Sequence, residues 1–345
     1  MHLSLIVPAP FDAVSGGYAY DRRIVGGLRE AGHTVNVVEL AGVHPLADEA
    51  ARNAARAAWH DLTEETRPII DSLALPAFAG METTLTTRNA VGVIHHPTAM
   101  ETGLREADRN GLLAIENRLL PLLARVIVTS ATTGERLAAD FGVEAARIRV
   151  VVPGTDDAPR SVGSGGPTCG IISVGTLVPR KGHDVLLRAL ARLFDLDWRV
   201  TIVGSLERDP VHARTLAALA VEFGIDARVR FAGEMTDAEL EVLWREADIF
   251  ALATHWEGYG MAVAEALKRG LPVAVGGGGA AASLVPPEAG VVCHPGDHIN
   301  LSKALRRLIF DATLRHDVAE AAFRVGQTLP NWQTQAREFV QALAE

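Results

Sequence analysis

Short apolar segments alternate with longer amphipathic segments along most of this chain. In the first half, the apolar segments are rich in valine and isoleucine and cover residues 3–7, 34–38, 91–94, 126–129 and 148–152. Helical periodicity fills much of the space between them, for example over residues 18–30, 104–123 and 132–141. Continuous apolar strands separated by helices are typical of a parallel sheet that is covered on both faces. The pattern therefore predicts the α/β class.

The alternation restarts after a break at residues 153–168, which are rich in proline, glycine, serine and aspartate. This composition predicts an exposed linker. Beyond the break, strands are predicted at residues 170–174, 199–203, 229–232, 249–252, 272–275 and 290–293, with helices such as 183–194, 211–223 and 237–246 between them and a final helix over 332–343. We therefore expect two Rossmann-like domains, residues 1–155 and 166–330, facing each other across a cleft that suits a small ligand.

Charge and targeting signals exclude several function classes. The net charge of −9 over 345 residues argues against a nucleic-acid partner held through its phosphates. Cys169 and Cys293 lie in apolar stretches, and their spacing predicts buried thiols rather than a disulfide or a metal site. The N-terminus lacks the basic region and long apolar run of a signal peptide, and no stretch approaches a membrane span. The expected location is cytoplasmic, with at most peripheral membrane contact.

The most specific motif is His-Trp-Glu-Gly-Tyr-Gly-Met-Ala-Val-Ala-Glu-Ala at residues 255–266, directly after the predicted strand 249–252. Gly258 and Gly260 permit tight backbone turns, and a helix is predicted from about Tyr259 to residue 269. The start of a helix offers free amides and a positive dipole end, which together attract an anion. The motif therefore predicts an anion site in the loop after a buried strand.

Two carboxylates flank this helix start, with Glu257 just before it and Glu265 in the helix body. Ionised carboxylates accept hydrogen bonds from vicinal hydroxyls. A sugar, a diphosphate and a ribose in series would place hydroxyls at both ends and an anion between them. The alternative is an ordinary amphipathic helix with two solvated glutamates. The position of Glu257 in a glycine-rich loop after a buried strand favours the ligand site.

A second motif, residues 175–183, follows the first predicted strand of the second domain. It contains Lys181, one of only three lysines in the chain. A point charge here could neutralise a diphosphate leaving group, and the neighbouring Arg180 could add a bidentate contact. The alternative is a pair of solvated charges at a helix start. Because cations oppose the dipole there, a nearby bound anion would explain them better.

Two loops of the first domain follow predicted strands. Gly16 and Gly17 could let a phosphate or sugar approach the backbone closely, or could form a plain turn. His95 and His96 follow strand 91–94. An imidazole there could bond a sugar hydroxyl or move a proton, or could cap backbone carbonyls. We see no further ligand at metal-binding spacing, so no metal site is predicted.

Acceptor contacts are expected in the first domain. Asp71 ends the strand-like segment 68–71, and Glu101 lies shortly after the two histidines. Either carboxylate, together with His96, could touch an acceptor. Solvated or helix-capping roles are the alternatives. The glycine run 276–279 also follows a predicted strand, but many loops have this composition.

Taken together, these motifs resemble the GT-B glycosyltransferases of family 4. Glu257 and Glu265, within Glu-Gly-Tyr-Gly-Met, resemble the paired-glutamate signature of that family. The second domain is similar from residue 173 to about residue 308. This similarity includes Val174-Gly175, Arg180-Lys181-Gly182, Phe231-Ala232-Gly233, Ala247-Asp248 and Gly270-Leu271-Pro272-Val273. The first domain is similar mainly through Gly16-Gly17 and His95.

The resemblance implies a retaining, metal-independent transferase without a cofactor, in which the second domain holds a nucleoside-diphosphate sugar. Glu257 would contact the transferred sugar, Glu265 the ribose, Lys181 the diphosphate, His95 the sugar, and Gly17 the phosphates. The further donor-binding candidates are Gly16, Arg180, Thr176, Gly258, Tyr259, Gly260, Met261 and Met235. The acceptor would be a hydroxyl-bearing small molecule, glycan or lipid-linked molecule bound by the first domain. The helix within residues 331–345 would pack back on that domain.

One departure keeps other functions open. The family usually has an arginine directly after the position of Gly175, where this chain has Thr176, and Arg180 is the candidate replacement. A protein that binds a nucleotide sugar without turnover is therefore one alternative. Another GT-B enzyme, such as a sugar-nucleotide epimerase, is a second. A phosphorylase would need a pyridoxal lysine, and Lys268 and Lys303 lie in patterns typical of a helix surface.

Overall fold

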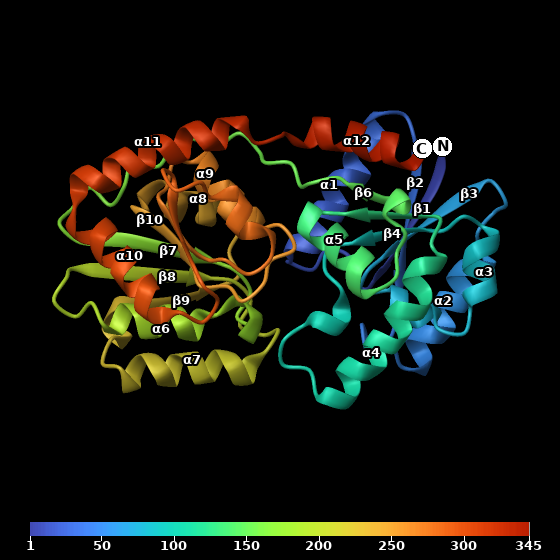
Figure 1. Cartoon of the computed structure of the whole chain (residues 1–345), viewed down its shortest axis with the longest axis horizontal. Helices are drawn as coiled ribbons and strands as arrows, with labels where there is room; N and C mark the ends of the chain where they lie inside the picture. The colour runs from blue at the N-terminus through green and yellow to red at the C-terminus, as the bar shows by residue number, and fades with distance from the viewer. Residues whose placement is uncertain (345) are drawn as a thin grey trace. The chain divides into compact units, whose positions relative to one another are not determined.

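A computed structural model describes residues 1–344 and divides the chain into two compact units (Figure 1). Unit 1 combines residues 1–154 with the segment that begins at Asn331, and unit 2 runs from Thr155 to Pro330. The division after Gly154 lies next to the boundary expected at residue 155. Unit 1 is therefore built from two segments that are far apart in the sequence.

Unit 1 contains a parallel sheet of six strands in the order β2-β1-β3-β4-β5-β6. Its strands are β1 (His2–Pro8), β2 (Thr34–Leu40), β3 (Thr66–Asp71), β4 (Val91–Ile94), β5 (Arg125–Val128) and β6 (Ile148–Val150). Helices α1 (Gly16–Glu30) and α12 (Trp332–Ala344) pack together on one face. The opposite face carries α2 (Glu49–His60), α3 (Glu82–Thr87), α4 (Glu106–Leu119) and α5 (Ala131–Asp140). The strand order reverses between β1 and β3.

Unit 2 contains a second parallel sheet of six strands, in the order β12-β11-β10-β7-β8-β9. Its strands are β7 (Cys169–Val174), β8 (Trp198–Val203), β9 (Val229–Gly233), β10 (Ile249–Leu252), β11 (Val273–Gly276) and β12 (Gly290–Cys293). Read from the β9 edge, this is the strand order of the dinucleotide-binding Rossmann fold, with its switch point between β7 and β10.

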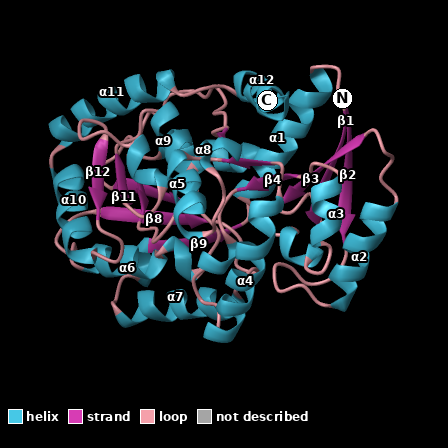
Figure 2. Cartoon of the chain, turned by 45° about the vertical axis from the view of Figure 1, so that its right-hand side comes forward, coloured by secondary structure: helices cyan, strands magenta, loops and turns pink. Residues whose placement is uncertain are grey.

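Helices cover both faces of the second sheet, as Figure 2 shows for both units. One face carries α6 (His183–Ala191), α7 (Pro210–Glu222) and α10 (His298–Phe310). The other carries α8 (Asp237–Glu246), α9 (Met261–Lys268) and α11 (Ala312–Thr328). The two sheets confirm the predicted α/β class with two Rossmann-like domains.

Each of these strands lies where the hydrophobic pattern predicts one, with ends that differ by at most two residues. Helix ends differ more. The helix predicted over residues 104–123 begins at Glu106 and ends at Leu119, where a 3₁₀ turn over Leu120–Leu122 replaces it. Pro121 lies in that turn, and proline has no amide to continue the α-helical hydrogen bonds.

The segment 153–168 contains the boundary between the two units, as a linker should, but only eight of its sixteen residues are exposed. Its first residues are buried, and Ser161 Oγ donates to the carbonyl oxygens of Arg245 at 2.9 Å and Ala247 at 2.6 Å. Lys268 Nζ lies 2.9 Å from Asp157 Oδ1, and Lys268 is 6% exposed rather than on the helix surface. Turn-forming residues predict irregular backbone, but they do not reveal which carbonyls that backbone will bond. This segment is fastened to unit 2.

Two further expectations can be compared with the structure. Cys169 and Cys293 are free, buried thiols, as predicted, and burial raises the pKa of Cys169 to about 12. Within residues 1–344, no helix is both long enough and apolar enough to cross a membrane.

Candidate active site

Two loops meet at the switch point of unit 2. The loop after β7 carries Arg180 and Lys181, and the loop after β10 carries Glu257 and leads into α9. In open parallel sheets, ligands bind beyond the carboxyl ends of the strands where the strand order reverses. The two most specific sequence motifs therefore come together at the place where this fold binds ligands.

Glu257 is the centre of this arrangement. Its Oε1 atom accepts from Lys181 Nζ at 2.7 Å and from Thr254 Oγ1 at 2.9 Å, and Arg180 Nη1 lies 3.5 Å from the same oxygen. Glu257 is 7% exposed. A buried carboxylate is costly unless it is paired and hydrogen-bonded, and here it is both. Glu257 is thus the centre of a largely buried charge cluster.

Backbone hydrogen bonds fasten the two loops to each other. Arg180 Nη1 donates to the Trp256 carbonyl at 2.7 Å, and the His255 amide donates to the Arg180 carbonyl at 2.8 Å. Thr254 Oγ1 lies 3.1 Å from that same carbonyl. Arg180 therefore holds the two loops together, in addition to any contact with a ligand.

Glycines permit this close approach. Gly182 has a φ of 63°, and a Cβ there would lie 2.0 Å from the Ala253 carbonyl oxygen. Gly175 leaves room for the side-chain stem of Lys181, whose Cδ would be 3.2 Å from an added Cβ. Gly260, with a φ of 106°, turns the chain into α9 one residue before Met261. A side chain at Gly182 would separate the loops that hold Glu257.

The glycine run 276–279, to which the sequence gives little weight, supports the Glu257 loop from behind. The Glu257 amide donates to the Gly278 carbonyl at 3.0 Å, and the Ala280 amide donates to the Glu257 carbonyl at 2.9 Å. A Cβ on Gly278 would lie 1.7 Å from the His255 carbonyl oxygen, and one on Gly279 would lie 2.1 Å from the Glu257 carbonyl oxygen. The run therefore supports the Glu257 loop through contacts between backbone atoms.

Replacing Gly278 with alanine should therefore destabilise unit 2 by about 2–3 kcal/mol, the size typical of overpacking. Gly166→Ala is the matched control, because nothing lies within 4 Å of its added Cβ. Urea unfolding of both variants measures the difference, and the control should stay within about 0.5 kcal/mol of the unsubstituted protein. Equal unfolding midpoints for the two variants would contradict the contact.

Charge, rather than burial, decides the ionisation of Glu257. Burial alone would raise the pKa of Glu257, but Lys181 and then Arg180 lower it, and the net pKa lies below the ordinary value of 4.5. His183, at the start of α6, is fully buried, and burial followed by the charge of Lys181 lowers its pKa to about 3. The carboxylate is thus ionised and His183 neutral at neutral pH.

The other residues of unit 2 that are predicted to contact the sugar donor lie on α9 or on loops that follow strands of its sheet. Glu265 is in the body of α9, as expected, and is half-buried. Tyr259 is 8% exposed, and burial raises its pKa to about 12. Thr176 follows β7, and Met235 lies just beyond β9; both are half-buried. Gly258 and Met261 flank the turn into α9 and are half-buried as well.

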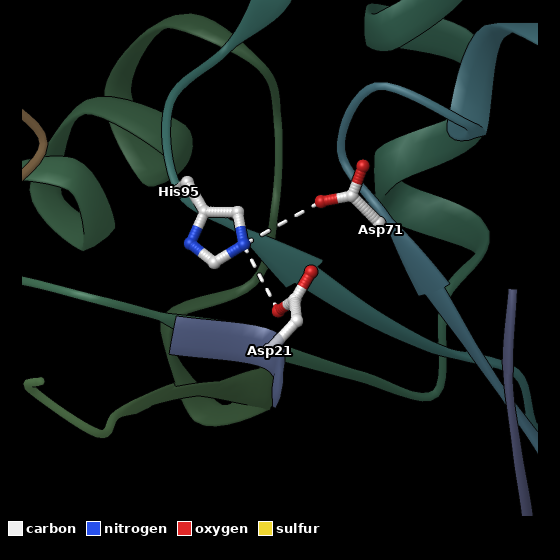
Figure 3. Close-up of side chains that lie close together, drawn as sticks. All are labelled: Asp21, Asp71 and His95. Carbon is white, nitrogen blue, oxygen red and sulfur yellow. Dashed lines mark hydrogen bonds and ion pairs between the residues drawn. The ribbon is translucent and has the colours of Figure 1, made fainter. Parts of the chain in front are cut away.

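Unit 1 has its own polar cluster at the carboxyl ends of its strands (Figure 3). His95 Nε2 lies 3.1 Å from Asp21 Oδ1 and 3.5 Å from Asp71 Oδ2. Both aspartates are 2% exposed, and the His95 side chain is 17% exposed. Figure 3 shows Asp21 coming from a helix, α1, and Asp71 from the end of a strand, β3. The cluster stands at the reversal point of the first sheet.

Gly16 and Gly17 form the first turn of α1, two residues earlier than the predicted helix start at residue 18. The Ser15 side chain caps this helix by accepting from the Tyr18 amide. A Cβ on Gly17 would lie 3.2 Å from His95 Cδ2, so the helix start and the imidazole are in contact. Gly17 and His95 thus belong to one local structure.

The predicted acceptor residues divide into two groups. Asp71 contacts His95 and its Oδ1 accepts from the Leu73 amide at 2.8 Å, so its carboxylate is engaged inside unit 1. His96 and Glu101 are half-buried in the loop after β4. That loop is held by buried Glu116, which accepts from the Thr98 amide at 2.6 Å. The structure brings Asp71 to another predicted site residue, His95.

Among residues 1–344, Asp21, Asp71 and His95 are the one group of three ligating side chains close enough to share a cation, with ligand atoms within 4.8 Å of one another. Nε2 lies within hydrogen-bond range of Asp21 Oδ1 at 3.1 Å, and its 3.5 Å separation from Asp71 Oδ2 is that of an ion pair.

Comparisons with known proteins identify the family. The family model described as glycosyl transferases group 1 matches residues 157–325, and the model described as glycosyltransferase family 4 matches residues 16–158. Together they cover both units. The chain belongs to the GT-B glycosyltransferases of the family 4 type.

A similar curated relative is D-inositol 3-phosphate glycosyltransferase from Corynebacterium aurimucosum, which is 28% identical over 72% of this chain and 62% of the relative. The chain spans less than two thirds of the length of the curated relatives matched first. Among solved structures, sucrose-phosphate synthase from Thermosynechococcus elongatus has a TM-score of 0.83 at 19% identity, over 100% of this chain and 98% of that one. HepE from Anabaena, solved with UDP and glucose, has a TM-score of 0.77 at 17% identity, over 100% of each chain.

Three features of these two clusters are absent from the sequence prediction. Asp21 is one, although it lies at helical spacing with buried Ile24, Val25 and Leu28, so the periodicity alone places a carboxylate on a buried face. Thr254, which bonds Glu257, carries no comparable signal. The support by Gly278 depends on a contact between two loops that no local pattern encodes.

Proposed function

We propose that this chain transfers a hexose-type sugar from a nucleoside-diphosphate sugar to a hydroxyl acceptor, with retention of anomeric configuration and without a metal or other cofactor. The observation that carries the proposal is the buried contact of Lys181 with Glu257 at the switch point, 2.7 Å between Nζ and Oε1. A cation and a carboxylate there suit, respectively, a diphosphate and the hydroxyls of a sugar.

The start of α9 supports a diphosphate in this position. The helix begins at Met261 without a side-chain cap, directly after the loop that holds Glu257. Amides at a helix start carry a partial positive charge that favours phosphate. Glu265 in the same helix would accept from ribose hydroxyls, and Met235 lies on the loop after β9, where base contacts are expected.

The proposed reaction is a front-face displacement. The acceptor hydroxyl oxygen bonds to the anomeric carbon on the face from which the diphosphate departs. The bond between that carbon and the diphosphate oxygen breaks, and the departing diphosphate takes the hydroxyl proton. Lys181 stabilises the negative charge that develops on the diphosphate. This route is favoured because Glu257 is ion-paired to Lys181 and is therefore not a free nucleophile. A covalent sugar adduct on any side chain would refute this route.

A panel of nucleotides tests the donor class directly. UDP, GDP, ADP and TDP are added separately in a thermal-shift experiment, and one of them should stabilise the protein by about 2.7 kcal/mol at one hundred times its dissociation constant. The corresponding sugar nucleotide should then release nucleoside diphosphate when acceptors are supplied, and the anomeric configuration of the product is read by NMR. Stabilisation by none of the four, with no release, would refute the proposal.

One observation favours a second function. Thr176 stands where the family usually has an arginine, and Arg180 is engaged by the Trp256 carbonyl. Weak neutralisation of the diphosphate would favour a protein that binds a nucleotide sugar without transferring it. In the same panel, stabilisation by a nucleotide without release of diphosphate from any sugar nucleotide would identify this case.

A further inference from the structure

His95 presents only one of its two ring nitrogens to the buried carboxylates of unit 1. Nε2 is 3.1 Å from Asp21 Oδ1, and Figure 3 shows the other nitrogen turned away from both Asp21 and Asp71. An ionised carboxylate can only accept a hydrogen bond. The Nε2 atom therefore carries a proton. The surroundings of the ring decide whether Nδ1 carries one as well.

We infer that Asp21 is a positioning residue for sugar transfer: its carboxylate holds the Nε2–H of His95 and leaves Nδ1 as the ring atom that meets an oxygen of the sugar substrate. This inference rests on the proposed function, because that function places His95 at the substrate. The partner that holds one nitrogen of an imidazole selects what the other nitrogen offers.

The surroundings of Asp21 fit this role. Asp21 comes from α1, where it lies on the same buried face as Ile24, Val25 and Leu28. Its Oδ2 atom is buried and has no hydrogen-bond partner within residues 1–344. A carboxylate among apolar side chains is costly unless it is paired. The bond to His95 is therefore the contact that offsets its burial, and a residue kept only for packing would not need the charge.

The imidazole ring is held on its sides as well as at Nε2. Tyr20 packs against it edge to face, with ring centroids 5.2 Å apart, and the Tyr20 hydroxyl donates to the Val151 carbonyl at 3.0 Å. Gly17 lies against the ring, since an added Cβ would be 3.2 Å from Cδ2. Because the ring cannot turn freely, the direction of Nδ1 is set by unit 1 itself.

The charges around His95 also favour a second proton on its imidazole ring, at Nδ1. Asp21 and Tyr20 face it from α1, Asp71 faces it from the end of β3, and Thr129, after β5, donates to its carbonyl at 3.4 Å. Burial lowers the pKa of His95, but the charge and hydrogen bond of Asp21, then Asp71, raise it, and the net pKa lies above 6.5. Burial and Asp21 raise the pKa of Asp71 to about 7. The raised pKa of His95 favours the doubly protonated ring, in which Nδ1 donates to an oxygen.

NMR of the unsubstituted protein with ¹⁵N-labelled histidine tests the inference, and a variant is needed only to assign the signals. The His95 signals are assigned by their loss in His95→Gln. Above the titration midpoint, the neutral ring should carry its proton on Nε2, and the midpoint should lie above 6.5. A neutral ring with its proton on Nδ1 would overturn the inference.

Asp21→Asn tests the consequence for the reaction. An amide can donate to Nε2, so the proton of the neutral ring should move to Nδ1, and the titration midpoint of His95 should fall. We expect kcat/KM to drop by about 10–100-fold, as when a histidine loses its orienting partner, with the pH profile moving to lower pH. Asp140→Asn is the control, because Asp140 pairs with Arg136 on the exposed surface of the same unit.

The outcomes separate this inference from the proposed function. An Asp21→Asn variant with unchanged tautomer, titration midpoint and kcat/KM would overturn the positioning role. If no sugar nucleotide is turned over by the unsubstituted protein, while the Nε2–H tautomer is present and depends on Asp21, the hold of Asp21 on His95 stands and the proposed function fails.

Discussion

Substituting Lys181 by methionine is expected to lower kcat by about 10²–10³-fold, the loss seen when one preorganised charge-stabilising group is removed from an active site. Methionine keeps most of the aliphatic stem that packs against Gly175, so the loops should stay in place. The missing group is the ammonium that contacts Glu257 Oε1 at 2.7 Å. Steady-state kinetics with the donor identified by the nucleotide panel measures the change, and the affinity for the nucleoside diphosphate should fall with kcat.

Lys303→Met is the matched control. Lys303 lies in the same unit on α10, is exposed, and donates to Asn300 Oδ1 at 3.2 Å. Its replacement should leave kcat and unfolding unchanged. A folded Lys181→Met protein that keeps more than half of its kcat would show that the diphosphate is neutralised elsewhere, with Arg180 as the next candidate.

Glu257→Gln is expected to destabilise unit 2 by about 3–5 kcal/mol at pH 7, because the variant leaves Lys181 and Arg180 without their buried countercharge. Glutamine keeps the shape of the side chain, so the loss reports charge. The transfer activity should fall as well, since the carboxylate that would accept from the sugar hydroxyls is gone. Chemical unfolding measures the loss of stability, and kcat/KM measures the loss of activity. Glu320→Gln is the control, because Glu320 belongs to a more exposed ion pair of the same unit.

The pH dependence of this loss has a defined sign. The folded-state pKa of Glu257 is lowered below 4.5, so its ionised form stabilises the fold above that pH, and this contribution disappears as the pH falls through the folded pKa. The difference between Glu257→Gln and the unsubstituted protein should therefore shrink below pH 4.5. The double variant Lys181→Met/Glu257→Gln should recover part of the stability, with a coupling of about 1–3 kcal/mol. Additive losses would mean that the pair is not coupled.

Periodicity predicts the sheets of this protein well because a strand buried on both faces leaves a continuous apolar run. Strand β10 is an example: residues 249–252 are predicted and found as one strand. The motifs around Glu257 and Lys181 are predictable for a related reason. Each follows a central strand, and the switch point of a parallel sheet brings such loops together without any need to know the packing.

The features that the sequence does not predict depend on contacts between distant backbone segments, which leave little trace in the sequence. Lys268 is predicted at a helix surface because a lysine near a helix end is usually solvated, yet the segment around Asp157 folds over it. The glycines at 278 and 279 look like an ordinary loop until the His255 and Glu257 carbonyls are placed against them. Asp21 is the intermediate case, visible as a charge on an apolar face but without an indication of its partner.

The return of the chain to unit 1 has a consequence for how the protein is made. Helix α12 packs on α1, where the ring centroids of Trp332 and Tyr20 are 6.0 Å apart. Tyr20 is the residue that packs against His95. During synthesis, every residue of unit 2 leaves the ribosome before α12 does, so unit 2 can finish folding while unit 1 still lacks a helix. A fragment ending at residue 154 would leave that face of α1 uncovered. An isolated unit 1 that keeps α12 on α1 requires residues 1–154 joined to the segment that starts at Asn331.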